Sequence, residues 1–153
     1  MRLRGLILRG GGIKVSPITK KELKKLENFE FEWEKELRFE VFKLELTRTK
    51  EVVGLLSIDK LFEELRTEIR LLEISKPNIG KLIRYDRIAG ILIAFACKES
   101  FICGFYGFVS LIPKTRLIDH YINKYGFKQF GRHLAIELEM SENLMNKYLI
   151  DEK

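Results

Sequence analysis

The sequence predicts an α/β fold in which helices cover both faces of a mixed β-sheet. In the first half of the chain, runs of alternating apolar and polar residues indicate strands that are joined by short turns. In the second half, apolar strand-like runs alternate with helical patterns, an order typical of crossovers between strands. The chain holds no internal repeat and no linker rich in Pro, Gly or Ser, so we expect a single domain over residues 1–153.

Strands dominate the first half of the chain. Apolar and polar residues alternate strictly in 42–46, which marks a strand with one buried face. The segment 48–51 then leads into the apolar run 52–58, so these two strands are expected to form a hairpin. The expected strands of this half are 13–15, 42–46, 52–58 and 68–74.

A first helix is expected between the first two of these strands. Thr19 and Glu22 form a capping-box pattern, which predicts a helix that continues to about Leu26. The segment 29–38 alternates acidic and aromatic residues, and its pattern leaves its secondary structure open.

The second half begins with the most apolar segment of the chain. Residues 88–101 are apolar on almost every side, which is typical of a helix packed deep inside a domain, and Gly104 is expected to end it. Thr115 can cap a further helix that Gly126 ends. The remaining expected elements are strands at 108–112 and 134–138 and a C-terminal helix at 141–149.

Composition excludes several classes of protein. With 46% hydrophobic and 33% charged residues, the chain can build a core and is not disordered. The apolar stretch near the N-terminus is too short for a signal peptide, and the longest later apolar run, 91–97, is far below the roughly 20 residues that span a bilayer. Cys97 and Cys103 match no metal-binding pattern, so no metal site is expected. We therefore expect a soluble, cytoplasmic protein with no membrane partner.

The net charge of +6 suits an anionic partner, which includes nucleic acid, acidic lipid and a phosphorylated cofactor. The segment from Arg84 to Gly90 lies between an expected strand and the apolar helix. Its small residues would let main-chain N–H groups approach an anion at the positive end of that helix, and Arg84 and Arg87 would add ionic contacts. A solvated turn with two chance arginines is the alternative interpretation.

The element order and this turn resemble the GNAT superfamily of acetyl-CoA-dependent N-acetyltransferases over nearly the whole chain. The family signature at the pyrophosphate loop is Arg or Gln, two residues, Gly, one residue, then Gly or Ala. The run from Arg84 to Ala89 is similar to it at both ends, with Arg87 in place of the glycine. In an alternative register Tyr85 comes first, Ile88 stands at the glycine and Gly90 is the final small residue. The segment 120–127 is similar to the family's aromatic-Tyr…Gly-Phe ending of a later helix.

The resemblance implies acetyl-CoA as the acyl donor. Its pantetheine arm would lie against the main chain of the strand that ends near Ser75, and its pyrophosphate would lie on the segment from Arg84 to Gly90. Lys114 stands near a position where the family often has Asn. The implied cofactor-binding residues are Leu72, Ile74, Ser75, Arg84, Tyr85, Asp86, Arg87, Ile88, Ala89, Gly90 and Lys114.

Two residues are the candidates for proton transfer, in a reaction where an amine attacks the thioester directly. Tyr121 is the candidate general acid, because a phenol can protonate the leaving thiolate; the alternative is a tyrosine packed in the core. Glu73 is the candidate base because it lies on the strand beside the thioester, and the alternative is an outward-facing carboxylate. His120 and His133 are interpreted as surface histidines.

The sequence leaves other functions open. A non-catalytic protein of the same fold that acts through protein contacts is one, and a basic nucleic-acid-binding module is another, motivated by the lysines between 20 and 25. The chain shows no helix-turn-helix and no aromatic RNA-binding motif, which argues against nucleic acid. The acceptor is expected to contact 29–38 and 60–67, and carboxylates in 27–45 favour a cationic acceptor. A homodimer is expected only by analogy with the family.

Overall fold

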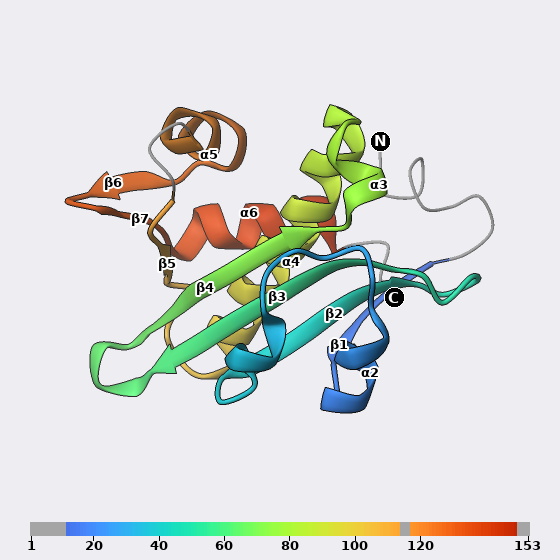
Figure 1. Ribbon diagram of the computed structural model, residues 1–153. Coiled ribbons are helices and arrows are strands. Elements are labelled where there is room, and N and C mark those ends of the chain that lie inside the picture. The colour runs from blue at the N-terminus through green and yellow to red at the C-terminus, as the bar shows by residue number, and fades with distance from the viewer. Residues whose placement is uncertain (1–11, 114–116, 150–153) are drawn as a thin grey trace.

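The computed structural model describes residues 12–113 and 117–149, and its centre is a seven-stranded sheet in the order β1-β2-β3-β4-β5-β7-β6 (Figure 1). Neighbouring strands pair antiparallel except β4 and β5, which run parallel, so the sheet is mixed as predicted. The strands are β1 (Ile13–Pro17), β2 (Glu40–Leu46), β3 (Val52–Leu61), β4 (Arg66–Ile74), β5 (Val109–Leu111), β6 (Lys128–Phe130) and β7 (His133–Ile136).

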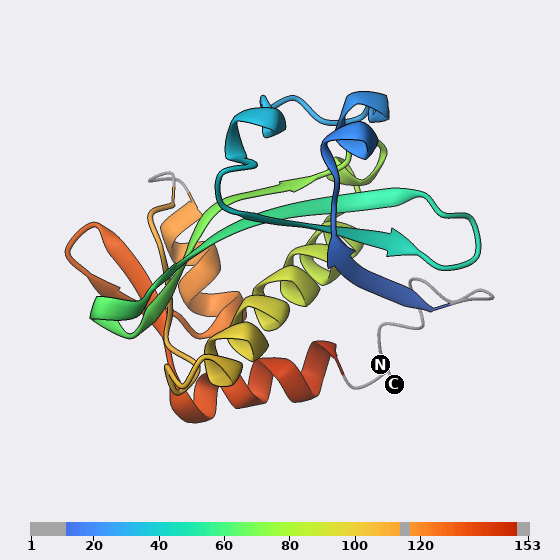
Figure 2. The ribbon, with the colours of Figure 1, turned by 90° about the horizontal axis from the view of Figure 1, so that it is seen from below.

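Helices lie on both faces of the sheet, which confirms the predicted architecture (Figure 2). One face carries α2 and the short 3-10 helix η1, and the other carries α4, α5 and α6. The helical elements are α2 (Lys20–Lys25), η1 (Trp33–Glu36), η2 (Phe62–Glu64), α3 (Lys76–Ile79), α4 (Leu82–Ile102), α5 (Ile118–Tyr125) and α6 (Leu138–Tyr148).

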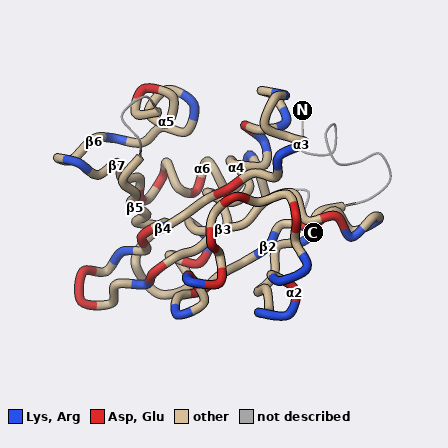
Figure 3. The backbone as a smooth tube through the Cα atoms, viewed as in Figure 1, with Lys and Arg blue, Asp and Glu red and all other residues tan. Residues whose placement is uncertain are grey.

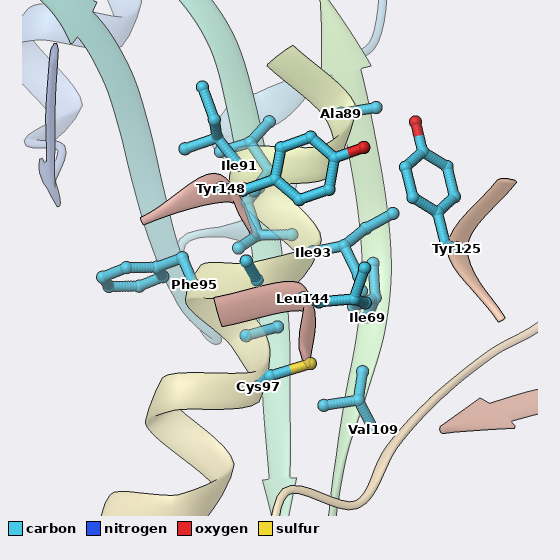
Figure 4. Packing of buried hydrophobic residues seen from close by; sticks show 14 of the residues in the cluster. Ile69, Ala89, Ile91, Ile93, Phe95, Cys97, Val109, Tyr125, Leu144 and Tyr148 are labelled. Atoms are coloured by element: carbon cyan, nitrogen blue, oxygen red, sulfur yellow. The ribbon is translucent and has the colours of Figure 1, made fainter. Parts of the chain in front are cut away.

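The sheet separates two hydrophobic clusters. Because successive side chains of a strand point to opposite faces, Leu56 packs in the large cluster around α4 while Leu55 packs under α2 and η1 with Trp33. In the large cluster, buried side chains of α4 such as Ile91 lie between the sheet and α6 (Figure 4). The helix that the sequence shows as apolar on almost every side is therefore covered on two sides.

Local signals in the sequence placed several boundaries correctly. The Thr19 side chain accepts a hydrogen bond from the Glu22 N–H, and the Glu22 side chain accepts one from the Thr19 N–H, so the capping box of α2 is formed. Gly126 follows α5 with a φ of 84° and Gly104 follows the end of α4 with a φ of 81°. Both dihedrals are in the left-handed region that glycine adopts without a steric penalty.

Other boundaries differ from the prediction. The deep helix begins at Leu82, not at residue 88, so the expected turn from Arg84 to Gly90 is wrong and these residues are helical. Residues 82–89 include no glycine or proline, and the Tyr85 N–H already bonds the Lys81 oxygen at 2.9 Å. Leu138 was expected to end a strand and instead begins α6.

Strand β6 was not predicted, because its residues are exposed and carry no alternation. It forms through pairing with β7, which its own sequence does not encode. The Thr115 cap lies outside the described residues. Within the described ranges, no helix is both long enough and apolar enough to cross a membrane.

Candidate active site

The parallel strands β4 and β5 separate after a short stretch of pairing. Their ladder joins Thr67, Glu68 and Ile69 to Val109, Ser110 and Leu111, after which β4 continues to Ile74 without β5 beside it (Figure 1). The register between β3 and β4 shifts at the same level, which makes Arg70 an extra residue on β4. A bulge of this kind bends its strand, so it accounts for the opening between β4 and β5.

Main-chain groups of β4 face this opening. The Ser75 N–H donates to the Val53 oxygen on β3 at 2.9 Å, so the groups of Leu72 and Ile74, which alternate with it, point to the opposite edge. These are groups to which an extended ligand could bond as an added strand. The Ser75 N–H, which the sequence placed in this role, is already used within the sheet.

Tyr121 on α5 is partly buried among aromatic rings. Its ring centroid lies 5.8 Å from that of Tyr125 and 5.9 Å from that of Phe127. Burial, together with the nearby Tyr85 phenol on α4, raises the pKa of Tyr121 to about 12. Tyr121 therefore keeps its proton at neutral pH, as a proton donor must.

His120 is not a simple surface histidine. Its Nε2 lies 2.9 Å from Oδ1 of Asp86, a buried carboxylate on α4, and the Tyr125 hydroxyl donates to the Asp86 main-chain oxygen at 2.9 Å. When Nε2 carries the proton toward Asp86, Nδ1 keeps a lone pair and can accept a proton. Sequence reasoning missed this pair because the two residues lie 34 positions apart and no local spacing joins them.

Glu73 is buried on the other face of the sheet, the one that carries α2 and η1, where it holds the segment that leads into η1. Its carboxylate accepts hydrogen bonds from the Glu30 N–H at 2.6 Å, the Phe31 N–H at 3.2 Å and the Trp33 indole at 2.7 Å. It is therefore not the outward-facing carboxylate of the alternative interpretation. These three donors occupy most of the roughly four acceptor positions of the carboxylate.

The main-chain N–H groups that could bind an anion lie in the first turn of α4. Inside a helix each N–H bonds the carbonyl four residues earlier, so the N–H groups from Tyr85 to Gly90 are already used. The main-chain N–H groups of Leu82, Ile83 and Arg84, in the first turn, are the ones that an anion could bind. Arg84 Nη1 donates to the Asn78 side chain at 3.2 Å, and Asn78 in turn donates to the buried Ser75 hydroxyl at 2.8 Å.

A pocket adjoins this turn on the side of α5 and α6. It carries the cationic side chains of Arg87, Lys124 and Lys147, from three different helices. Figure 3 shows lysine and arginine positions on these helices. The lining residues are Leu82, Ile83, Asp86, Arg87, Lys124, Lys147 and Tyr148.

The remaining predicted residues have other surroundings. Ile88, Ala89 and Gly90 are buried in the core, so they do not form an anion-binding loop. Lys114 lies outside the described residues. In the part of the chain that the structure describes, no group of three or more His, Cys, Asp or Glu side chains could hold a metal ion.

The architecture has counterparts of known structure, although no protein-family model and no curated protein matches the sequence. The KacTA–DNA complex aligns with a TM-score of 0.63 at 13% identity, covering 88% of this chain and 99% of that one. AtaTR bound with AcCoA aligns with a TM-score of 0.60 at 12% identity, covering 87% and 98%. A chimera of spermidine N-acetyltransferase SpeG from Vibrio cholerae and hSSAT aligns with a TM-score of 0.59 at 16% identity, covering 86% and 98%.

These alignments extend over most of this chain and nearly all of each counterpart. The chain therefore has the fold of the GNAT acetyltransferases.

Proposed function

We propose that this protein is an N-acyltransferase that moves an acetyl group from acetyl-CoA to a primary amine. The observation that carries the proposal is the opening between β4 and β5, with the unpaired edge of β4 on one side and α5, which carries Tyr121, on the other. Neighbours of the same fold include a complex with AcCoA and a spermidine N-acetyltransferase. Their fold, shared with this chain, supports the reaction class, and their low sequence identity leaves the acceptor open.

The residues fit the donor in two places. The main-chain groups of Leu72 and Ile74 match the amides of a pantetheine arm, and the first turn of α4 with Arg84 and Arg87 matches its phosphates. When bound, the donor supplies an activated thioester. The protein then has to orient the amine, remove a proton from its ammonium form and protonate the leaving thiolate.

Tyr121 is the proposed general acid. As the amine nitrogen bonds the acyl carbon, the carbon–sulfur bond breaks and the thiolate takes the phenolic proton of Tyr121. Glu73 and His120 are both candidates to accept the proton of the ammonium group. His120 keeps a ring nitrogen for this role, whereas the Glu73 oxygens already accept three hydrogen bonds.

The acceptor side of the proposed site is the face of the sheet that carries α2 and η1. Segment 28–33 is held against the end of β4 through Glu73 and through the Lys76 N–H, which donates to the Asn28 oxygen at 3.1 Å. Several carboxylates of this region are paired with cations, as Glu36 is with Arg70 at 2.9 Å. Their number alone therefore does not establish a cationic acceptor.

A second candidate function is a protein of this fold that does not catalyse acyl transfer. The observation that favours it is the helical path of residues 84–90, which leaves no glycine loop around a pyrophosphate. The two candidates differ in whether the chain binds acetyl-CoA with an affinity that depends on its phosphates.

The test is calorimetric titration of the full chain with acetyl-CoA, followed by an assay of CoA release with a panel of primary amines. With an active amine, Tyr121→Phe should lower the rate by about 100-fold, because general acid catalysis commonly contributes that factor. Binding of acetyl-CoA should stay unchanged, because the ring and its packing remain.

Tyr106→Phe is the matched control. Tyr106 is exposed in the loop between α4 and β5, at the far end of α4 from the opening. Absence of acetyl-CoA binding by a folded sample would reject the proposed function. Binding with full activity in Tyr121→Phe would reject the acid role alone.

A further inference from the structure

Asp86 on α4 contacts α5 near both of its ends. Its Oδ1 lies 2.9 Å from Nε2 of His120, in the first turn of α5. Its main-chain oxygen accepts a hydrogen bond at 2.9 Å from the Tyr125 hydroxyl, in the last turn. With 8 residues, α5 is too short to be stable by itself, so contacts of this kind determine where it lies. Tyr121 lies between the two contacts, so Asp86 helps to place the proposed general acid.

The imidazole of His120 is held in one orientation. Two aromatic rings meet it edge to face, with centroid separations of 6.4 Å to Tyr121 and 6.0 Å to Tyr125. The Asp86 side chain keeps only 10% of its surface exposed, so its carboxylate needs a hydrogen-bond donor there. An N–H on Nε2 is such a donor. The His120 side chain keeps 36% of its surface exposed, so a substrate can still reach the ring.

This arrangement selects one tautomer of the neutral imidazole. With the proton on Nε2 and directed at Asp86, Nδ1 carries the lone pair that a base needs. The carboxylate would also stabilise the imidazolium that forms when Nδ1 takes up a proton. Glu73 is less suited to this task, because three hydrogen bonds already use its carboxylate to hold the segment before η1.

We propose that Asp86 is a positioning residue that fixes His120 in the tautomer with a lone pair on Nδ1, and that His120, not Glu73, accepts the proton of the attacking amine. This inference rests on the proposed function and names the base within it. The acid and the base are then neighbours on one short helix, and a single residue of α4 holds that helix in place.

The protons balance in this scheme. The ammonium group of the acceptor gives one proton to Nδ1 of His120, which passes it to solvent. The neutral amine attacks the acyl carbon, the carbon–sulfur bond breaks, and the thiolate takes the phenolic proton of Tyr121. The second proton that the nitrogen loses restores the Tyr121 phenol, so each turnover releases one proton to solvent.

The tautomer can be measured directly in the free protein. Two-bond ¹⁵N–¹H correlation spectra of the full chain, labelled on histidine and recorded at about pH 8, where an ordinary histidine is neutral, show which ring nitrogen carries the proton. The chain has 2 histidines, and His133 on β7 serves as the internal reference. We expect the proton of His120 on Nε2. In Asp86→Asn the amide can donate to Nε2, so the Nδ1–H tautomer should appear while the His133 signals stay unchanged.

Kinetics test the role in the reaction, with acetyl-CoA as donor and spermidine, phenethylamine and a lysine peptide as acceptors. His120→Gln should lower kcat by about 100-fold, the usual contribution of a general base, and Asp86→Asn should approach the same loss. The KM for the amine and the affinity for acetyl-CoA should stay close to those of the wild type. His133→Gln is the matched control, because it removes the other histidine, on β7.

Each outcome supports or overturns a stated part. If Asp86→Asn changes neither the tautomer nor kcat, or if it only lowers the thermal midpoint, Asp86 is a structural link and the positioning role is overturned. If His120→Gln keeps full activity while Tyr121→Phe loses it, His120 is not the base and the proposed function stands. If the wild-type chain acetylates none of the three amines and does not bind acetyl-CoA, the proposed function fails and the role of His120 as base fails with it.

Discussion

Glu73 is a single buried carboxylate that holds a long connecting segment in place. It accepts two main-chain hydrogen bonds and one from the Trp33 indole, all from residues about 40 positions earlier in the chain. The Trp33 indole N–H is buried and would otherwise lack this partner, and an unsatisfied buried donor costs about 1–3 kcal/mol. At the scale of one residue, Glu73 therefore positions the segment between α2 and η1, whether or not it also takes up a proton.

Replacing Glu73 should test this positioning role. We expect Glu73→Ala to lower the free energy of unfolding by about 1–3 kcal/mol, because it leaves the buried Trp33 indole N–H unpaired. Urea denaturation followed by Trp33 fluorescence measures this, since Trp33 is the chain's one tryptophan and a direct partner of Glu73. Glu73→Gln, which keeps one acceptor oxygen, should be less harmful. Equal stability of wild type and Glu73→Ala would contradict the role.

At the scale of an element, α4 owes its position to a residue that weakens it as an isolated helix. Gly90 in a helix interior costs roughly 1 kcal/mol relative to alanine. Against this, a Cβ at position 90 would lie 2.5 Å from the Tyr148 ring, far inside normal contact distance. The ring is buried and cannot swing away into solvent, so the steric effect exceeds the propensity effect.

We therefore expect Gly90→Ala to destabilise the protein by about 1–3 kcal/mol, the usual cost of overpacking. The matched control is Gly80→Ala, where a Cβ would meet no atom within 4 Å and φ is −78°. Thermal denaturation should show a lower midpoint for Gly90→Ala and little change for Gly80→Ala. A stabilised Gly90→Ala protein would mean that α6 does not pack on α4 as described.

At the scale of the whole molecule, α4, α5 and α6 are joined by a group of buried tyrosines. Burial raises the pKa of Tyr125 and Tyr148, and it raises the pKa of Tyr121 to about 12. In the unfolded chain these phenols titrate near their ordinary value of about 10. Above that pH the unfolded state loses protons that the folded state retains, so folding becomes less favourable as pH rises.

Stability should therefore be complete below about pH 10 and should fall toward pH 12. Each buried tyrosine contributes a loss of up to about 1.4 kcal/mol per pH unit over this window. Urea denaturation between pH 8 and pH 11.5 measures the slope. Tyr125→Phe should make the slope shallower, while Tyr106→Phe, a change at an exposed site, should leave it unaltered. Lysines that titrate in the same range are common to all three proteins, so the comparison isolates the tyrosines.

Patterns within a few residues determined much of the fold. Alternation in 42–46, the capping box of Thr19 and Glu22 and the glycine at 126 each act over one or two turns of chain, and the structure contains all three features. The mixed character of the sheet followed because strands joined by short turns pair with each other and those joined by helices cross over. The helical pattern before Gly126 placed Tyr121 on a helix, whereas a ligand site beside the end of β4 was implied only by the resemblance to the GNAT family.

The tertiary structure alone decided which charged and polar side chains are buried next to one another. Contacts between residues distant in the chain cannot be predicted from a local pattern. Here they are the His120–Asp86 pair, the three hydrogen bonds on Glu73 and the pocket between three helices. The start of α4 was misplaced because residues 82–87 mix apolar and charged side chains, so the fully apolar run that marked the helix in the sequence begins only after them. The sequence by itself determined which elements form, because capping and periodicity are local properties. The packing of α4, α5 and α6 determined which side chains share a site, because that depends on contacts between elements far apart in the chain.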